Sequence, residues 1–139
     1  MKSHTDLEQS KKLAEILPIE GADHHYVRKT CDSMGNPVDG KWSIPKYGNP
    51  NSSHANYMVM GFMNYEIISC WSLAALFNVI PKHIKDYNVL RIDISENDFA
   101  IWYDEVGFGV NNDLPDITAD NPIDACVEMI LKLYEQKLL

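Results

Sequence analysis

Residues 89–103 read VLRIDISENDFAIWY, and this stretch decides the fold. Over residues 89–94 apolar side chains alternate with charged ones, and residues 99–103 repeat the alternation after the polar pair Glu96-Asn97. A period of two is typical of strands that bury one face, so we predict an antiparallel β-hairpin. The predicted buried face consists of Leu90, Ile92, Ile94, Phe99, Ile101 and Tyr103.

A helix predicted from residue 121 onward should pack on this hairpin. Asn121 can cap it, Pro122 occupies the first helical position and Asp124 lies in the first turn, where a carboxylate is favourable. Apolar residues then recur at helical spacing and form a stripe wide enough to face a sheet. The stripe is Ile123, Cys126, Val127, Ile130, Leu133 and Tyr134.

Two other helices are predicted upstream. One covers about residues 5–16 and begins with a capping box between Thr5 and Glu8. The other is a short, largely buried helix at residues 73–80 that Pro81 terminates. Its candidate caps are Ser69 and Ser72.

The remaining strands flank a long polar loop. We predict a short strand at residues 26–31 with residues 41–44 as its hairpin partner, and two strands or one strand with a bulge at residues 56–68. Between residues 32 and 53, 15 of 22 residues are Gly, Pro, Asn, Asp or Ser, which predicts a loop. We therefore expect a single α+β domain over residues 1–139, with an antiparallel sheet of about four to five strands packed against two or three helices.

Composition narrows the class of protein. The chain has 139 residues, of which 45% are hydrophobic, as in ordinary globular domains. No apolar run approaches the roughly 20 residues that span a bilayer, and the N-terminus is polar, so we expect a cytoplasmic protein without membrane contact. Cys31, Cys70 and Cys126 are widely spaced and odd in number, so we expect reduced thiols.

The negative charge is concentrated in one window, residues 92–131, which holds no Lys or Arg. Its ten carboxylates are Asp93, Glu96, Asp98, Asp104, Glu105, Asp113, Asp116, Asp120, Asp124 and Glu128. The window carries −10 and the other residues sum to +2, for a net charge of −8. Such a surface repels nucleic acid and attracts basic protein partners.

Most of these acids have a structural explanation as outer-face residues of the hairpin or as first-turn residues of a helix. Glu105, Asp113 and Asp116 lack one, and we predict that they bind a protein partner. A calcium loop is not predicted, because residues 111–116 lack its alternating ligands and its glycine.

Catalytic and metal-binding motifs are weak. His24 and His25 are neighbours on an extended segment and should point to opposite faces, so we predict no metal site and no cofactor. Gly107-Phe108-Gly109 is interpreted as a plain turn, because neither a Lys-Ser/Thr pair nor a helix follows it. The protein is therefore predicted not to be an enzyme.

Aromatic and basic residues mix in the central part of the chain. Arg28, Trp42 and Tyr47 could hold a planar, nucleotide-like anion, although packing of the aromatic residues under the long loop is the favoured interpretation. This pattern makes a small-molecule binding protein the alternative hypothesis.

Residues 70–81, beginning Cys70-Trp71-Ser72-Leu73, and residues 121–139, beginning Asn121-Pro122-Ile123-Asp124, look like segments of small uncharacterised proteins of phages and prophages of gut bacteria. These segments cover about 30 residues of the chain and carry no catalytic constellation. The resemblance implies a phage accessory context, with no established activity.

The leading hypothesis is thus a non-enzymatic accessory protein that binds a protein partner through an acidic face. A metal-dependent hydrolase using His24, His25 or His54 ranks last. A homodimer through the hairpin edge is a further hypothesis, although acids at that edge could prevent such pairing.

Overall fold

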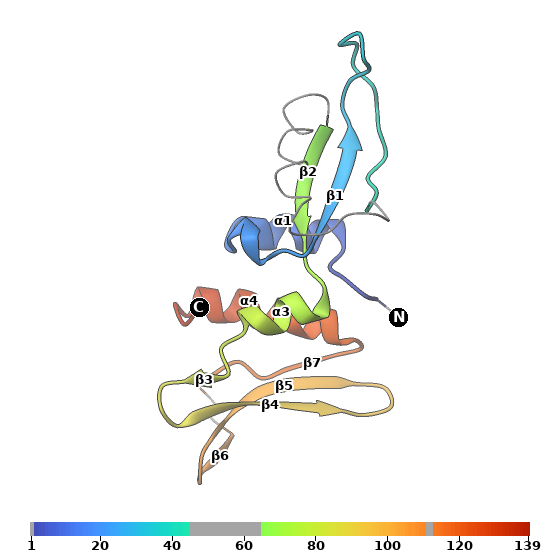
Figure 1. The fold of residues 1–139 in the computed structure, drawn as a ribbon. Helices are drawn as coiled ribbons and strands as arrows, with labels where there is room; N and C mark the ends of the chain where they lie inside the picture. Colours follow the sequence, from blue (N-terminus) through green and yellow to red (C-terminus); the bar gives the residue numbers. More distant parts are fainter. Residues whose placement is uncertain (1, 45–64, 111–112) are drawn as a thin grey trace. The chain divides into compact units, whose positions relative to one another are not determined.

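The computed structural model describes residues 2–44, 65–110 and 113–139 and has an α+β fold (Figure 1). By contacts the chain divides into two compact units, which are described separately. The C-terminal unit contains residues 1–5 and 72–139, and the N-terminal unit contains residues 6–71. The single domain expected over residues 1–139 stays a prediction.

The C-terminal unit is built on the predicted hairpin. Within its described residues the sheet has five strands: β3 (His83–Ile84), β4 (Asn88–Ile94), β5 (Phe99–Glu105), β6 (Gly109–Val110) and β7 (Ile117–Ala119). All pairings are antiparallel, and β4 pairs with β5 along its whole length. On its other side, β5 pairs with β7 near its start and with β6 near its end. β5 is therefore the central strand, and the predicted antiparallel sheet is confirmed.

Helices α3 (Leu73–Val79) and α4 (Pro122–Glu135) cover one face of this sheet (Figure 1). α4 packs on β5 and β7, and α3 packs on α4, which confirms that the C-terminal helix docks on the hairpin. Tyr103 is fully buried there, and its hydroxyl donates to the Pro81 carbonyl at 2.7 Å. Other fully buried core residues are Leu76, Ile101, Ile117, Ile123, Cys126, Met129, Ile130 and Leu133.

The prediction that one face of the hairpin is buried is wrong for the C-terminal half of β4, which holds Ile92 and Ile94. Ile92 lies opposite Ile101, yet Ile92 is 41% exposed and Ile101 is fully buried. Ile94, opposite Phe99, is 75% exposed. The helix layer is centred on β5 and β7, so the apolar side chains of the outer strand are not covered. For a similar reason Tyr134 leaves the predicted stripe, since its position at the edge of the α4 contact face leaves it 50% exposed.

The N-terminal unit contains α1 (Leu7–Ala14), a 3₁₀ turn at Ile19–Gly21, β1 (His24–Lys29) and β2 (Tyr65–Cys70). α1 packs on β2, and β1 pairs antiparallel with β2. Ser43 exchanges two backbone hydrogen bonds with Val27, at 2.9 and 3.0 Å, which confirms the predicted return of residues 41–44. Residues 45–64, with most of the strand region predicted at 56–68, lie outside the described residues.

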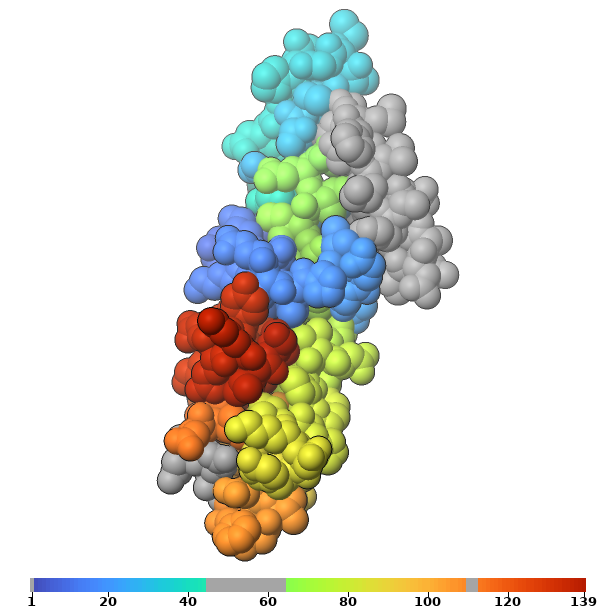
Figure 2. Space-filling model, turned by 90° about the vertical axis from the view of Figure 1, so that its left-hand side faces the viewer, coloured from blue at the N-terminus to red at the C-terminus, as the bar shows by residue number. Residues whose placement is uncertain are grey.

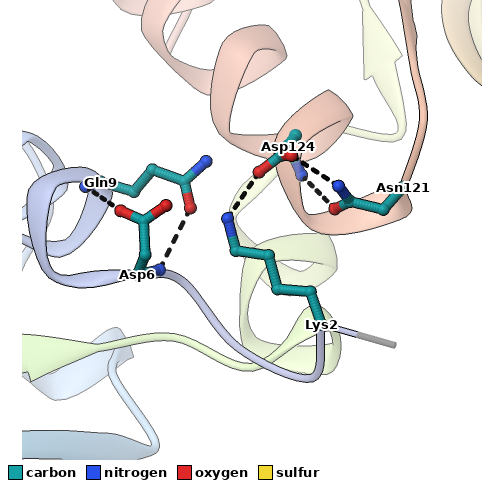
Figure 3. Close-up of polar contacts among 5 residues, drawn as sticks. All are labelled: Lys2, Asp6, Gln9, Asn121 and Asp124. Atoms are coloured by element: carbon teal, nitrogen blue, oxygen red, sulfur yellow. Dashed lines mark hydrogen bonds and ion pairs between the residues drawn. The ribbon is translucent and has the colours of Figure 1, made fainter.

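Helix caps confirm two predictions and correct a third. Asn121 Oδ1 accepts from the Asp124 amide at 3.0 Å, and Ser72 Oγ accepts from the Ala75 amide at 3.3 Å. The capping box of α1, however, is formed by Asp6 and Gln9 rather than by Thr5 and Glu8 (Figure 3).

The sequence TDLEQ contains two overlapping box patterns one residue apart. His4 forms an antiparallel bridge with Ser72, and Asp6 has φ −72° and ψ 176°, so the chain is still extended where the predicted helix would begin. No helix in the described part of the chain has the length and apolar content needed to cross a bilayer.

Candidate partner-binding site

A polar groove of about 500 Å³ lies at the end of the C-terminal sheet where β5 stops. Glu105 and Asp113, two of the three predicted partner-binding acids, both line it. The other lining residues are Ile84, Lys85, Tyr87, Asn88, Leu114, Gln136 and Leu138. Asp116 is exposed on the segment before β7 and is not among the lining residues. We call this site the acidic groove.

The turn after β5 exposes an aromatic side chain. Gly107 and Gly109 both have positive φ, +88° and +84°, a conformation that glycine adopts without steric cost. The Phe108 amide donates to the Glu105 carbonyl at 3.0 Å, which closes the turn. Phe108 is consequently held at the tip with 84% of its surface exposed.

Two further exposed apolar residues adjoin this turn. The Val106 amide donates to the Tyr87 carbonyl at 2.8 Å, so the β5–β6 turn is bonded to the segment that precedes β4. Tyr87 is 45% exposed and Val106 is 59% exposed. In Figure 2 the orange β5–β6 segment stands at the surface beside the yellow β3–β4 segment. We call Tyr87, Val106 and Phe108 the apolar tip.

The C-terminal end of α4 supplies another wall of the groove. Lys137 has φ +58°, which ends the helix, and the Leu138 amide donates back to the Leu133 carbonyl at 2.9 Å. The Gln136 amide donates to the Lys132 carbonyl at 3.0 Å. These bonds satisfy carbonyls of the last turn and fix Gln136 and Leu138 against the sheet end. Hence this wall of the groove is preformed.

The charge of the acidic window is partly compensated by cations from outside it. Lys2 Nζ lies 2.6 Å from Asp124, Arg91 Nε lies 3.2 Å from Asp104, and Lys132 Nζ lies 2.9 Å from Glu128. These contacts give three of the ten carboxylates an ionic partner. The window is therefore less uniformly negative than its composition indicates. At the acidic groove the lining residues carry two carboxylates, Glu105 and Asp113, against one cation, Lys85.

The predicted ligand site lies in the N-terminal unit and already has internal partners. Arg28 Nη2 lies 2.5 Å from Glu66 Oε2, and the Arg28 guanidinium stacks 4.9 Å from the ring centroid of Trp42. Arg28 and Trp42 therefore do lie together. Their arrangement, however, directs the Arg28 charge to Glu66. Tyr47 lies outside the described residues.

The histidines of the hydrolase hypothesis are separated by strand geometry. On β1, His24 is exposed and His25 is 4% exposed, as alternation along a strand requires. Among the described residues no three His, Cys, Asp or Glu side chains group as metal ligands would. His54 lies outside that part of the chain.

The buried thiols are poor nucleophiles. Burial raises the pKa of the Cys126 thiol to about 12, and Cys126 is fully buried. Since the thiolate is the reactive form, Cys126 serves as a core residue. Cys70 in the N-terminal unit is equally buried.

Comparison with known proteins found no matching family model, no matching curated protein and no matching solved structure.

Proposed function

We propose that this chain is a non-enzymatic accessory protein, in the phage or prophage setting that its sequence resemblance implies, and that it binds a protein partner through the acidic groove and the apolar tip. The observation that carries this proposal is that Glu105 and Asp113 line one groove, and that the exposed Val106 and Phe108 follow Glu105 in the turn after β5. An exposed aromatic side chain next to a charged groove is the composition of a recognition surface.

The two parts of this surface contribute differently. Phe108 has few side-chain torsions, so burying it in a partner loses less conformational freedom than burying a long flexible side chain. Aromatic anchors of this kind commonly supply most of the binding energy of an interface. The carboxylates at the groove accelerate association with basic surfaces and reject acidic ones. The partner we expect presents an apolar pocket flanked by Lys or Arg.

The nucleotide-like alternative, built on Arg28, Trp42 and Tyr47, stays a prediction. A phosphate at Arg28 must compete with Glu66, which holds the guanidinium at 2.5 Å. Each phosphate contact there must therefore offset the loss of an existing charge-assisted bond. For this reason we place the protein-binding function first.

A random peptide display library tests the proposal without a known partner. The full-length protein is expected to select peptides that combine aromatic or aliphatic residues with Lys or Arg. Binding of the selected peptides should weaken about tenfold or more on Phe108→Ala, the loss expected when a hot-spot side chain is truncated. The double variant Glu105→Lys with Asp113→Lys should reduce binding and its dependence on salt.

The matched control is Glu96→Lys with Asp98→Lys. These acids are exposed in the β4–β5 turn, at the other end of the hairpin from Glu105, and their replacement changes the net charge equally. The control should bind the peptides as the unmodified protein does. Equal loss in both double variants would mean that only the overall charge matters, and selection of no peptide family would refute the proposed surface.

A further inference from the structure

The outer edge of β4 is open over most of its length. β3 pairs with Asn88 and Val89, and the Leu90 amide donates to the Lys82 carbonyl at 2.9 Å. In the part of the chain that the structure describes, no strand pairs with residues 91–94 on this side. This edge lies apart from the acidic groove along the same hairpin.

Strand geometry tells which backbone groups face the edge. The Leu90 amide points toward β3, and backbone direction alternates along a strand, so the amides and carbonyls of Ile92 and Ile94 point to the same open side. Those of Arg91 and Asp93 point toward β5. The side chains of all four residues are exposed, with Ile92 and Ile94 on the helix-covered face and Arg91 and Asp93 on the other. A strand edge with exposed isoleucines is a template for another strand.

We propose that this edge pairs antiparallel with β4 of a second copy of the chain, with Ile92 opposite Ile92 of the second copy. In that alignment the two Ile92 residues exchange two backbone hydrogen bonds. Arg91 then stands opposite Asp93 of the second copy, and the two-fold symmetry repeats the pair. Opposite charges directly across a pair of strands are stabilising.

Other symmetric alignments are worse. Two copies form backbone hydrogen bonds only when residues whose amides and carbonyls point to the open side lie opposite each other. This requirement excludes half of the possible alignments. Centring on Asp93 places two carboxylates face to face, and centring on Arg91 places two guanidinium groups face to face. Centring on Ile94 runs the paired strand into the turn at residues 95–98. Complementary charge therefore selects Ile92 as the centre.

Arg91 can serve this contact without leaving its present partner. Its Nε atom bonds Asp104 Oδ2 at 3.2 Å, and a guanidinium has five N–H donors. The donors on its terminal nitrogens are additional to that bond. The ladder is limited to residues 91–93 of each copy, because this alignment places Ile94 of the second copy opposite Leu90, whose amide already bonds Lys82. We accordingly expect a reversible dimer that forms as concentration rises.

Sedimentation velocity of the full chain tests this pairing. The unmodified protein should shift from monomer to dimer over about a hundredfold range of concentration, and added salt should weaken the dimer. Ile92→Lys should abolish it by placing two cations at the centre. Arg91→Glu alone and Asp93→Arg alone should each weaken self-association about tenfold or more, since each turns two attractive pairs into repulsive ones.

Mixing these two single variants gives the sharpest result. The carboxylate introduced at position 91 of one copy then faces the guanidinium introduced at position 93 of the other, and the native Asp93 and Arg91 face each other. Heterodimer formation in the mixture supports the alignment. A monomer at every concentration of the unmodified protein overturns the proposal, as does a mixture that associates no better than its components.

Two controls distinguish loss of the dimer contact from unfolding of the monomer and from effects on the apolar tip. Thermal unfolding of each variant shows whether the monomer is still folded. Phe108→Ala, which truncates the most exposed side chain of the apolar tip, should leave self-association unchanged. If Phe108→Ala abolished dimerisation, the assignment of the dimer contact to the β4 edge would be overturned. If Phe108→Ala lost only peptide binding, the result would bear on the proposed function and not on the dimer.

Discussion

Lys2 Nζ lies 2.6 Å from Asp124 Oδ1 and ties the start of the chain to the first turn of α4 (Figure 3). Asp124 also accepts a hydrogen bond from the Asn121 side chain. One carboxylate of the acidic window thus neutralises a cation from the far end of the sequence and stabilises the N-terminus of a helix. Its role is structural, whereas Glu105 and Asp113 line the groove.

We expect Lys2→Gln to cost at most about 0.5 kcal/mol of unfolding free energy, because the pair is partly exposed and screened by solvent. Asn121→Ala should cost about 1 kcal/mol, since it removes the cap of the helix that covers the sheet. Urea denaturation at low salt measures both. Added salt should abolish the loss of stability caused by Lys2→Gln and leave the loss caused by Asn121→Ala. If Lys2→Gln lowered the free energy of unfolding more than Asn121→Ala, the ion pair would be stronger than we expect.

Shortening an isoleucine on the helix-facing side of the hairpin should lower the free energy of unfolding only where the helix layer covers that residue. Ile101→Val should cost about 0.5–1.5 kcal/mol, because Ile101 is fully buried beneath α4. Ile94→Val should change stability by less than about 0.5 kcal/mol, because Ile94 is 75% exposed. Both values come from denaturation of dilute monomer, and equal effects would show that the helix layer extends over β4.

The three cysteines should differ in reactivity. Cys70 and Cys126 are fully buried, and the pKa of Cys126 is raised to about 12 by burial, so neither should react with a thiol reagent in the native protein at neutral pH. Cys31 is partly exposed and should be labelled first. Mass spectrometry should find one label in native protein and three in denaturant. Cys31→Ser should remove the native label, and persistence of that label would refute the assignment.

The raised pKa of Cys126 also determines the direction in which stability changes with pH. The thiol of Cys126 is protonated in both states below its ordinary pKa of 9.0. As pH rises from there toward about 12, the unfolded chain ionises and the folded chain does not, so stability falls. Thermal unfolding should show this decline above pH 9, and Cys126→Ala should make it shallower. An unchanged slope would contradict the role of Cys126.

Asp32 should hold a turn in the N-terminal unit only while it is ionised. Its Oδ1 accepts from the amides of Asn36 and Met34, each at 2.9 Å. The Asn36 amide is the main cause that lowers the pKa of Asp32 below its usual 3.8. A depressed pKa means that the contribution is present above the ordinary value and is lost as pH falls through the lower folded one.

Amide chemical shifts of Met34 and Asn36 during an acid titration measure this transition. Their midpoint should lie below that of an unstructured aspartate, and Asp32→Asn should abolish the shared acid transition. A midpoint at or above the ordinary value would show that the carboxylate does not hold the turn.

Local pattern was enough to predict several elements of the C-terminal unit. Alternation over residues 89–103 predicted the hairpin, and Asn121-Pro122 predicted the start of α4, because both depend on interactions within a few residues. The cap of α1 was displaced by one residue, since His4 pairs with Ser72, which is distant in sequence. A local signal cannot choose between overlapping capping boxes when a distant contact sets the path of the chain.

The candidate site required more than local pattern. Charge counting singled out Glu105, Asp113 and Asp116, and only the first two line the groove. Three residues, Tyr87, Val106 and Phe108, carried no sequence signal beyond being apolar, and only Phe108 lies in the segment interpreted as a turn. Their exposure follows from the glycine turn and from the bond between Val106 and Tyr87.

The sequence by itself determined the α+β class, the antiparallel hairpin and the helix that packs on it, because amphipathic periods and caps act over short distances. Only the tertiary structure decided which isoleucines of that hairpin are buried, since coverage depends on α4 resting on β5 and β7. It also decided which acids are neutralised, because Lys2 reaches Asp124 across 122 positions of sequence. Pairs so far apart in sequence form only when the whole chain is folded.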